Sequence, residues 1–233
     1  MREEIIGGQR LILGDCLDVL PSLAAGSVDA VITDPPYGLI GNQGDWWKLH
    51  AGQKSGKALA AKRVWGSSEW AYVDPPEGSI EWIVASGLPA IVWGGNYLSH
   101  RLTRSSCWFV WDKQTNGDFG DAELAWTNIP GVVRLFQWMW NGCIMKVREE
   151  RVHPTQKPTA LLTWCIERAK VADGATVLDP FMGSGTTLVA AERLGRRGIG
   201  IEIDEGYYEI ALRRVEEAVK KRQDDAAQLT LTG

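Results

Sequence analysis

The tetrapeptide Asp34-Pro35-Pro36-Tyr37 combines the residue types needed to hold a planar ring that carries an amine. It directly follows the apolar run 28–32, and open α/β sheets bind ligands where their strands end. The Asp34 carboxylate and the Pro35 carbonyl can each accept one N–H of such an amine, and the two prolines keep the backbone rigid. The Tyr37 ring can stack on the ring that bears the amine. The tetrapeptide therefore predicts a site for an exocyclic amine.

A second Asp-Pro-Pro sequence, Asp74-Pro75-Pro76, lacks this context. It follows no apolar run, and Glu77 stands where the first copy has a tyrosine. Since Asp and Pro are common turn residues, we predict that the second copy is a turn.

A glycine-rich turn at 183–185 lies between an apolar run and a helical pattern. Glycines let a ligand approach the backbone, and the helix that follows offers unpaired N–H groups. The spacing is not G-x-G-x-x-G and the phosphate-loop lysine is missing, which disfavours a phosphate ligand. Asp179 would attract a cation instead, and Glu202, after the next predicted strand, can bind both hydroxyls of a ribose. A nucleoside without phosphate beside carboxylates points to S-adenosylmethionine.

Together, Asp34-Pro-Pro-Tyr37 and Asp179-Pro-Phe-Met-Gly-Ser-Gly-Thr186 resemble motifs of the DNA amino-methyltransferases of the permuted beta group. The sequence His153-Pro-Thr-Gln-Lys157-Pro158 matches a third element of that family. The resemblance covers about residues 10–40 and 150–215. It implies an enzyme that moves the methyl group of S-adenosylmethionine to an amine of a base flipped out of double-stranded DNA.

The resemblance also implies roles for single residues. Asp34, Pro35, Pro36 and Tyr37 would be catalytic. The cofactor would lie against Asp15, Cys16, Asp34, Lys157, Asp179, Phe181, Gly183, Ser184, Gly185, Thr186 and Glu202. Asp15 also has the position of a helix N-cap before Leu17. The stretch from His153 would be a rigid approach to a helix, with Lys157 either meeting a carboxylate or exposed as a surface cation.

Adenine N6 is favoured over cytosine N4, because the N4 enzymes of this family usually have Ser at the position of Asp34. Cytosine-N4 methylation remains an alternative, and so does a catalytically inactive DNA-binding regulator with the same fold. Carbon-5 methylation of cytosine needs a nucleophilic Cys in a Pro-Cys setting, which none of the four cysteines has. We expect no metal site, because the cysteines are scattered and no His lies near them.

Net charge is −4 over 233 residues, yet the segment 38–72 is locally basic. We predict that it is a DNA-facing loop that binds phosphates, although a solvated loop is the alternative; its cations are Lys48, Lys54, Lys57, Lys62 and Arg63. A short target-recognition region is expected at about 127–151. No apolar stretch is long enough to span a bilayer, so we place the protein in the cytoplasm of a bacterial or phage-infected cell. A homodimer is left open.

Strand-like and helix-like runs alternate along the chain, which predicts a doubly wound, mostly parallel α/β sheet. Strands are expected at 28–33, 90–93, 107–111, 132–138, 175–178 and 198–201, and helices at 79–86, 159–171, 186–194 and 205–222. The resemblance specifies a seven-stranded Rossmann-like sheet in permuted order, forming one methyltransferase domain over 1–224. Residues 225–233 are predicted to be a flexible tail, in which Gln228 to Leu231 resembles a peptide that docks on the sliding clamp.

Overall fold

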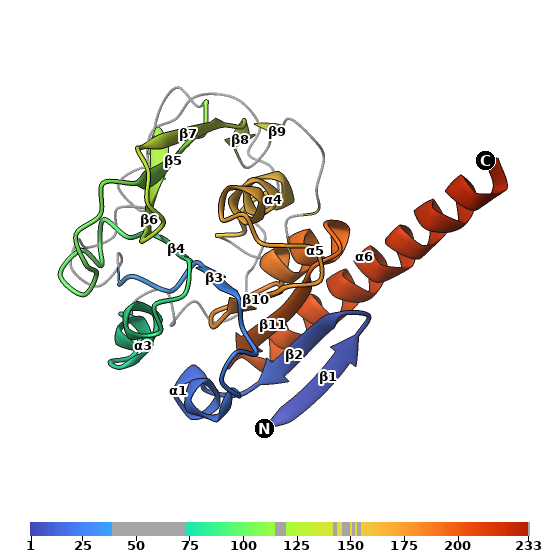
Figure 1. The fold of residues 1–233 in the computed structure, drawn as a ribbon, viewed down its shortest axis with the longest axis horizontal. Helices are drawn as coiled ribbons and strands as arrows, with labels where there is room; N and C mark the ends of the chain where they lie inside the picture. Colours follow the sequence, from blue (N-terminus) through green and yellow to red (C-terminus); the bar gives the residue numbers. More distant parts are fainter. Residues whose placement is uncertain are drawn as a thin grey trace, which may run out of the picture.

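The computed structural model describes residues 1–38, 73–114, 120–141, 144–145, 150, 152 and 155–232. Within this part of the chain, nine strands form one mixed sheet in the order β1-β2-β11-β10-β3-β4-β6-β5-β7 (Figure 1). The strands are β1 (Arg2–Ile6), β2 (Gln9–Leu13), β3 (Ala30–Thr33), β4 (Ala90–Trp93), β5 (Trp108–Asp112), β6 (Ala122–Thr127), β7 (Arg134–Gln137), β10 (Thr176–Asp179) and β11 (Arg197–Glu202). A separate antiparallel pair consists of β8 (Trp140–Asn141) and β9 (Ile144–Met145).

Helices cover both faces of the sheet (Figure 1). They are α1 (Cys16–Val19), the 3₁₀ turn η1 (Leu20–Ser22), α3 (Ser79–Ala85), α4 (Thr159–Arg168), α5 (Thr186–Arg193) and α6 (Glu205–Thr232). Successive side chains of a strand point to opposite faces. In β3, Val31 accordingly packs in the cluster that includes α1 and α3, whereas Ile32 packs in the one that includes α4 and α5. The predicted doubly wound α/β fold is confirmed.

The order of the strands brings two distant segments together. β3 pairs in parallel with β10, with Ala30 opposite Val177 and Val31 opposite Leu178, and β10 pairs in parallel with β11. β3 leads into Asp34–Tyr37, which we call the amine motif, and β10 leads into the glycine turn at 183–185. β3 therefore comes before β10 in the chain and lies beside it in the sheet. Because these strands are parallel, their carboxyl ends meet at one edge.

The sheet has two more strands than the seven predicted. β1 and β7 are its edges, and β1 is antiparallel to β2. β1 consists largely of exposed residues and so carries no clear apolar alternation. The run at 28–33 also begins two residues before β3 does.

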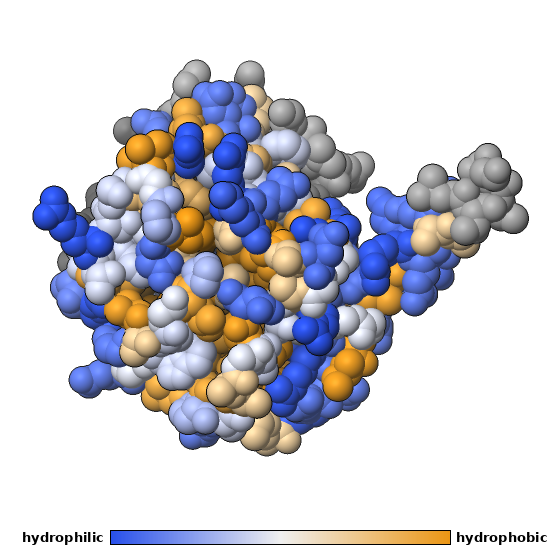
Figure 2. All heavy atoms as spheres, viewed as in Figure 1, coloured by the Kyte–Doolittle hydropathy of each residue, from blue (hydrophilic) through white to orange (hydrophobic). Residues whose placement is uncertain are grey.

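The predicted tail, 225–233, is helical as far as Thr232, because α6 continues to that residue. The segment from Gln228 to Leu231, which resembles a clamp-docking peptide, therefore lies in this helix. The residues Ala, Gln and Leu of this segment favour helix, and they extend a helix that tertiary contacts already stabilise. Figure 1 shows the end of α6 projecting from the body, and Figure 2 shows that its surface there is largely hydrophilic. No helix in the described part of the chain combines the length and apolar character that crossing a membrane requires.

The projecting part of α6 should contribute little to stability. Side chains from Lys220 to Gln228 are exposed, and Arg222 Nε contacts Glu192 Oε1 at 2.6 Å. Deleting residues 224–233 should change the free energy of unfolding in urea by less than about 0.5 kcal/mol. The matched comparison, Val215→Ala in the fully buried part of α6, should cost about 2 kcal/mol. A deletion that costs as much as Val215→Ala would show that the end of α6 packs on the domain.

Candidate active site

Asp179 joins the ends of β3 and β10. Its Oδ1 accepts hydrogen bonds from Thr33 Oγ1 at 2.7 Å and from the Phe181 amide at 3.1 Å, and its Oδ2 accepts one from Thr187 Oγ1 at 2.6 Å. Burial raises the pKa of Asp179 to about 6, although these donors favour the ionised form. A single carboxylate thus ties the amine motif to the glycine turn and to the start of α5.

A cavity of about 540 Å³ lies at this edge of the sheet, a size typical of small-molecule sites. Among the residues named from the sequence, its lining includes Asp15, Cys16, Asp34, Pro36, Lys157, Asp179, Phe181, Gly183, Ser184, Thr186 and Glu202. Pro35, Tyr37 and Gly185 are not part of the lining. Gly185 has a packing role instead: with φ at 77°, a Cβ there would lie 3.0 Å from the Cβ of Ala211 on α6.

The cavity is rich in carboxylates. Among the described residues of its lining, Lys157 is the one basic residue, against the acidic residues Asp15, Asp34, Asp74, Asp179, Glu202 and Asp204. Like charges repel strongly where water is partly excluded, so a phosphate is disfavoured and a cationic ligand is favoured. Apolar surface from Phe181, Met182 and Ile201 can cover a nucleoside ring. The cavity therefore fits a cationic nucleoside such as S-adenosylmethionine.

Glu202 closes the glycine turn from the end of β11. Its Oε2 accepts a hydrogen bond from the Gly183 amide and its Oε1 one from the Asp204 amide, both at 2.8 Å. Burial raises the pKa of Glu202 to about 7 against the effect of these donors. Each carboxylate oxygen can accept more than one hydrogen bond, so hydroxyl groups of a ligand can still be held.

Asp15 is the N-cap of α1 and also faces the cavity. Its Oδ1 accepts the Leu17 amide at 2.8 Å and caps α1, and the residue also lines the cavity. The neighbouring Cys16 is buried, and burial raises its pKa to about 12. The Cys16 thiol thus stays protonated at neutral pH and can act only as a weak hydrogen-bonding group.

The second Asp-Pro-Pro copy also reaches the cavity, which its sequence context did not predict. It is the turn before α3, as expected, but Asp74 and Pro76 belong to the lining. A Cβ at Gly38 would collide with Asp74 Oδ1, so Asp74 lies directly against the end of the amine-motif loop. In the sequence, only the repetition of Asp-Pro-Pro could have indicated this role.

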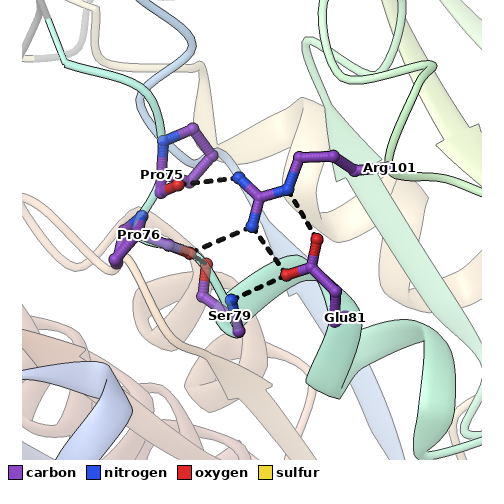
Figure 3. Close-up of polar contacts among 6 residues, drawn as sticks. Pro75, Pro76, Ser79, Glu81 and Arg101 are labelled. Atoms are coloured by element: carbon purple, nitrogen blue, oxygen red, sulfur yellow. Dashed lines mark hydrogen bonds and ion pairs between the residues drawn. The ribbon is translucent and has the colours of Figure 1, made fainter.

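Arg101 holds the second copy in place (Figure 3). It donates to the carbonyl oxygens of Pro75 at 2.7 Å and Pro76 at 3.0 Å, and it pairs with both carboxylate oxygens of Glu81 at 2.7 Å. The hydrogen bonds from Arg101 lower the pKa of Glu81 to about 2. This fork joins the turn to α3 as a rigid wall of the cavity.

Asp34 is held on one side and open on the other. Its Oδ2 lies 2.5 Å from Lys157 Nζ, whereas its Oδ1 is buried with no hydrogen-bond partner among the described residues. Lys157 had been placed on the cofactor side; it does line the cavity, and its ammonium group lies on the amine-motif carboxylate. Burial raises the pKa of Asp34, and the charge of Lys157 opposes this shift.

Tyr37 is part of an aromatic pair beside Asp34. Its ring stacks on that of Tyr97 with centroids 5.1 Å apart and planes inclined by 15°. Tyr97 remains 46% exposed. A Cβ at Gly94 would collide with two carbons of the Tyr37 ring, so a side chain there would displace Tyr37.

Several residues named from the sequence lie outside the described residues. These are the cations Lys48, Lys54, Lys57, Lys62 and Arg63, the start of the third motif at His153, and most of 142–149 in the expected recognition region. Their roles stay predictions. Glu123 and Lys113, by contrast, were not predicted and contact the site through Lys157, as described below.

Comparisons with known proteins agree with this geometry. The family described as DNA methylase matches residues 113–213. YubD of Escherichia coli (strain K12), described as a methylase, is 30% identical over 232 residues, which cover 94% of this chain and 95% of YubD. The type II methyltransferase M2.DpnII of Streptococcus pneumoniae is 49% identical over 80 residues, covering 34% of this chain and 30% of that protein.

Solved structures share the fold. The modification methylase TTHA0409 of Thermus thermophilus, in complex with S-adenosylmethionine, has a TM-score of 0.54 at 21% identity, covering 91% of this chain and 95% of that one. The complex of M1.HpyAVI with the same compound has a TM-score of 0.53 at 22% identity, covering 89% of this chain and 98% of that one. The cytosine-N4-specific PvuII methyltransferase has a TM-score of 0.56 at 17% identity, covering 93% of this chain and 91% of that one.

A parallel sheet with an amine motif and a glycine turn at one carboxylate-rich cavity defines a methyltransferase of the Rossmann-like class. Since the match to YubD spans nearly the whole of both chains, this chain belongs to the DNA methylase family. The predicted family is confirmed, and the cavity fits the predicted cofactor, S-adenosylmethionine.

Glu202 should make cofactor binding depend on pH. Below about 7 its carboxyl group is protonated, and only the ionised form accepts strong hydrogen bonds from ribose hydroxyls. Affinity for S-adenosylmethionine, measured by calorimetry between about pH 6 and 8.5, should therefore rise with pH. Glu202→Gln should bind about 10-fold or more weakly and lose this rise. The exposed neighbour Glu205→Gln serves as the control, and an unchanged slope in Glu202→Gln would contradict the role.

The wall formed by the second Asp-Pro-Pro copy should matter for binding rather than for chemistry. Arg101→Met removes the fork that holds Pro75 and Pro76, so the cavity should lose a preformed side and bind S-adenosylmethionine about 10-fold more weakly. At saturating cofactor, kcat should stay within about 3-fold, because Arg101 does not contact Asp34 or Lys157. Arg104→Met, an exposed change in the same segment, is the control. Equal binding by both variants would exclude this function of Arg101.

Proposed function

We propose that the protein methylates the N6 amine of adenine in DNA. The observation that carries this proposal is the state of Asp34, whose Oδ2 is fixed by Lys157 while its buried Oδ1 lacks a donor among the described residues beside the cofactor cavity. An N–H of the target amine supplies the missing donor. When bound, S-adenosylmethionine supplies an electrophilic methyl group on a sulfonium; the side chains described here orient the amine.

The adenine amine is a weak nucleophile, because its lone pair is delocalised into the ring. Asp34 Oδ1 and the Pro35 carbonyl oxygen accept its two N–H groups and so favour a pyramidal nitrogen whose lone pair points at the methyl group. Orientation and electrostatics then account for most of the rate increase. No covalent nucleophile is needed, and burial raises the pKa of both Cys16 and Cys165, which keeps these thiols protonated.

The tyrosine pair supports a flat substrate. Tyr37 and the half-exposed Tyr97 stand beside Asp34, and a base that reaches this site must leave the duplex and stack on an aromatic surface. The basic segment 38–72 directly follows Tyr37 and is proposed to hold phosphates of the same DNA strand.

Adenine is preferred to cytosine because a carboxylate, rather than a serine hydroxyl, stands at position 34. Cytosine-N4 methylation is the second candidate, and the inactive regulator with the same fold is the third. A homodimer and docking on a sliding clamp remain predictions, and the helical course of α6 through Gln228 and Leu231 does not favour the latter.

One assay separates these candidates. DNA is incubated with the enzyme and S-adenosylmethionine tritiated on its methyl group, then digested to nucleosides and separated. Label should appear in N6-methyl-2′-deoxyadenosine; label in N4-methyl-2′-deoxycytidine would reassign the target base, and no label would support the regulator. Asp34→Asn should lower kcat by about 1,000-fold, since one oriented acceptor is worth this order of magnitude. The same variant should still bind S-adenosylmethionine in calorimetry, which shows that it is folded.

A further inference from the structure

Four side chains of alternating charge run from Asp34 away from the cavity. Lys157 Nζ lies 2.5 Å from Asp34 Oδ2 and 3.1 Å from Glu123 Oε2, and Lys113 Nζ lies 2.6 Å from Glu123 Oε1. We propose that Glu123 is a positioning residue of the methyl transfer: together with Lys113 it fixes Lys157, which turns Asp34 so that Oδ1 faces the target amine. This inference rests on the function proposed above.

The four groups come from separate parts of the sheet. Asp34 follows β3, Lys157 precedes α4, Glu123 lies on β6, and Lys113 follows β5. The β5–β6 pair is closed at this end by the Lys113 amide, which donates to the Asp121 carbonyl at 3.0 Å. Neither Glu123 nor Lys113 lines the cavity, and the proposed effect of both on the substrate runs through Lys157 and Asp34.

Lys157 needs a second anchor. A lysine is a flexible chain with a compact charge, and one carboxylate alone leaves its ammonium free to rotate about that contact. Glu123 supplies the second contact, and the side chain of Lys157 is only 4% exposed, with its ammonium 5.6 Å from the centre of the Trp93 ring. A removed partner in a buried ion pair leaves an uncompensated charge, so the arrangement is sensitive to each member.

The positive and negative charges of these four linked side chains balance. Burial disfavours the ionised form of Glu123, yet Lys157 and Lys113 lower its pKa to about 2, so it stays anionic at any pH at which the enzyme works. With Asp34 ionised, the two carboxylates and two ammonium groups balance. Apart from Lys157, Glu123 and Lys113, the titratable groups near Asp34 among the described residues are Tyr37 and Asp179.

Glu123 and Lys113 should shift the ionisation of Asp34 in opposite directions. The negative charge of Glu123 raises the pKa of Asp34, and the positive charge of Lys113 lowers it. Activity requires the ionised carboxylate as an acceptor, so it is lost as pH falls through the pKa of Asp34. Removing Glu123 should therefore move the acid limb of kcat to lower pH, and removing Lys113 should move it to higher pH.

The test compares Glu123→Gln, Lys113→Met and the double variant with the wild-type enzyme. At saturating DNA and cofactor, Glu123→Gln should lower kcat by about 10- to 100-fold, because misplacing a reacting group by about 1 Å costs up to about 100-fold. Its Kd for S-adenosylmethionine should stay within about 2-fold, since cofactor groups are untouched. The pH at which kcat falls on the acid side should be lower in Glu123→Gln and higher in Lys113→Met than in the wild-type enzyme. In the double variant this pH should return towards the wild-type value while kcat stays low.

Asp121→Asn is the matched control, because it removes one carboxylate from an exposed position of the same strand pair. It should change neither kcat nor the acid limb. The proposal would be overturned if the acid side of the kcat pH profile did not move in the two single variants, or moved in the same direction in both. A parallel loss of melting temperature and cofactor affinity in Glu123→Gln and the shorter Glu123→Asp would also overturn it, because this would make Glu123 merely structural. Absence of methyl transfer by the wild-type enzyme would instead refute the proposed function.

Discussion

The parallel pairing of β3 with β10 is the constraint on which the site depends. It places the end of the amine-motif strand beside the start of the glycine turn, and the hydrogen bonds of Asp179 to Thr33 and Thr187 lock the two ends together. Because these bonds are buried, a shift of one strand would leave a carboxylate without donors, which is costly. The sheet thereby sets the distance between the cofactor cavity and the acceptor for the amine.

Electrostatics then divides the site into two parts. The cavity gathers carboxylates that suit a cationic ligand, and three of them, Asp34, Asp179 and Glu202, have raised pKa values because they are buried. At the other end, Lys157 and Lys113 balance the charges of Asp34 and Glu123. One cation thus keeps the acceptor for the amine oriented within a region that otherwise attracts positive charge.

The two Asp-Pro-Pro sequences show how context gives identical letters different tasks. In the first, Asp34 follows a buried strand and has its carboxylate fixed by a lysine; in the second, Asp74 lies in a turn that the Arg101–Glu81 fork holds against the cavity. Both meet at Gly38, whose missing side chain lets Asp74 approach the first loop.

Local patterns in the sequence determined much of the protein. The runs of β4, β10 and β11, the helical periods of α4 and α5, and the Asp34 and Asp179 motifs could be read from the chain because apolar spacing and turn residues act over a few positions. In the main sheet β1, β2 and β6 were missed, since β1 is largely exposed and the sequences of β2 and β6 lack a clear apolar alternation. Only the tertiary structure decided that Lys157 binds Asp34, that Glu123 and Lys113 stand behind it, that Asp74 reaches the cavity, and that α6 runs on to Thr232. These contacts join residues far apart in the chain, and no local pattern records which side chains a sheet will bring together.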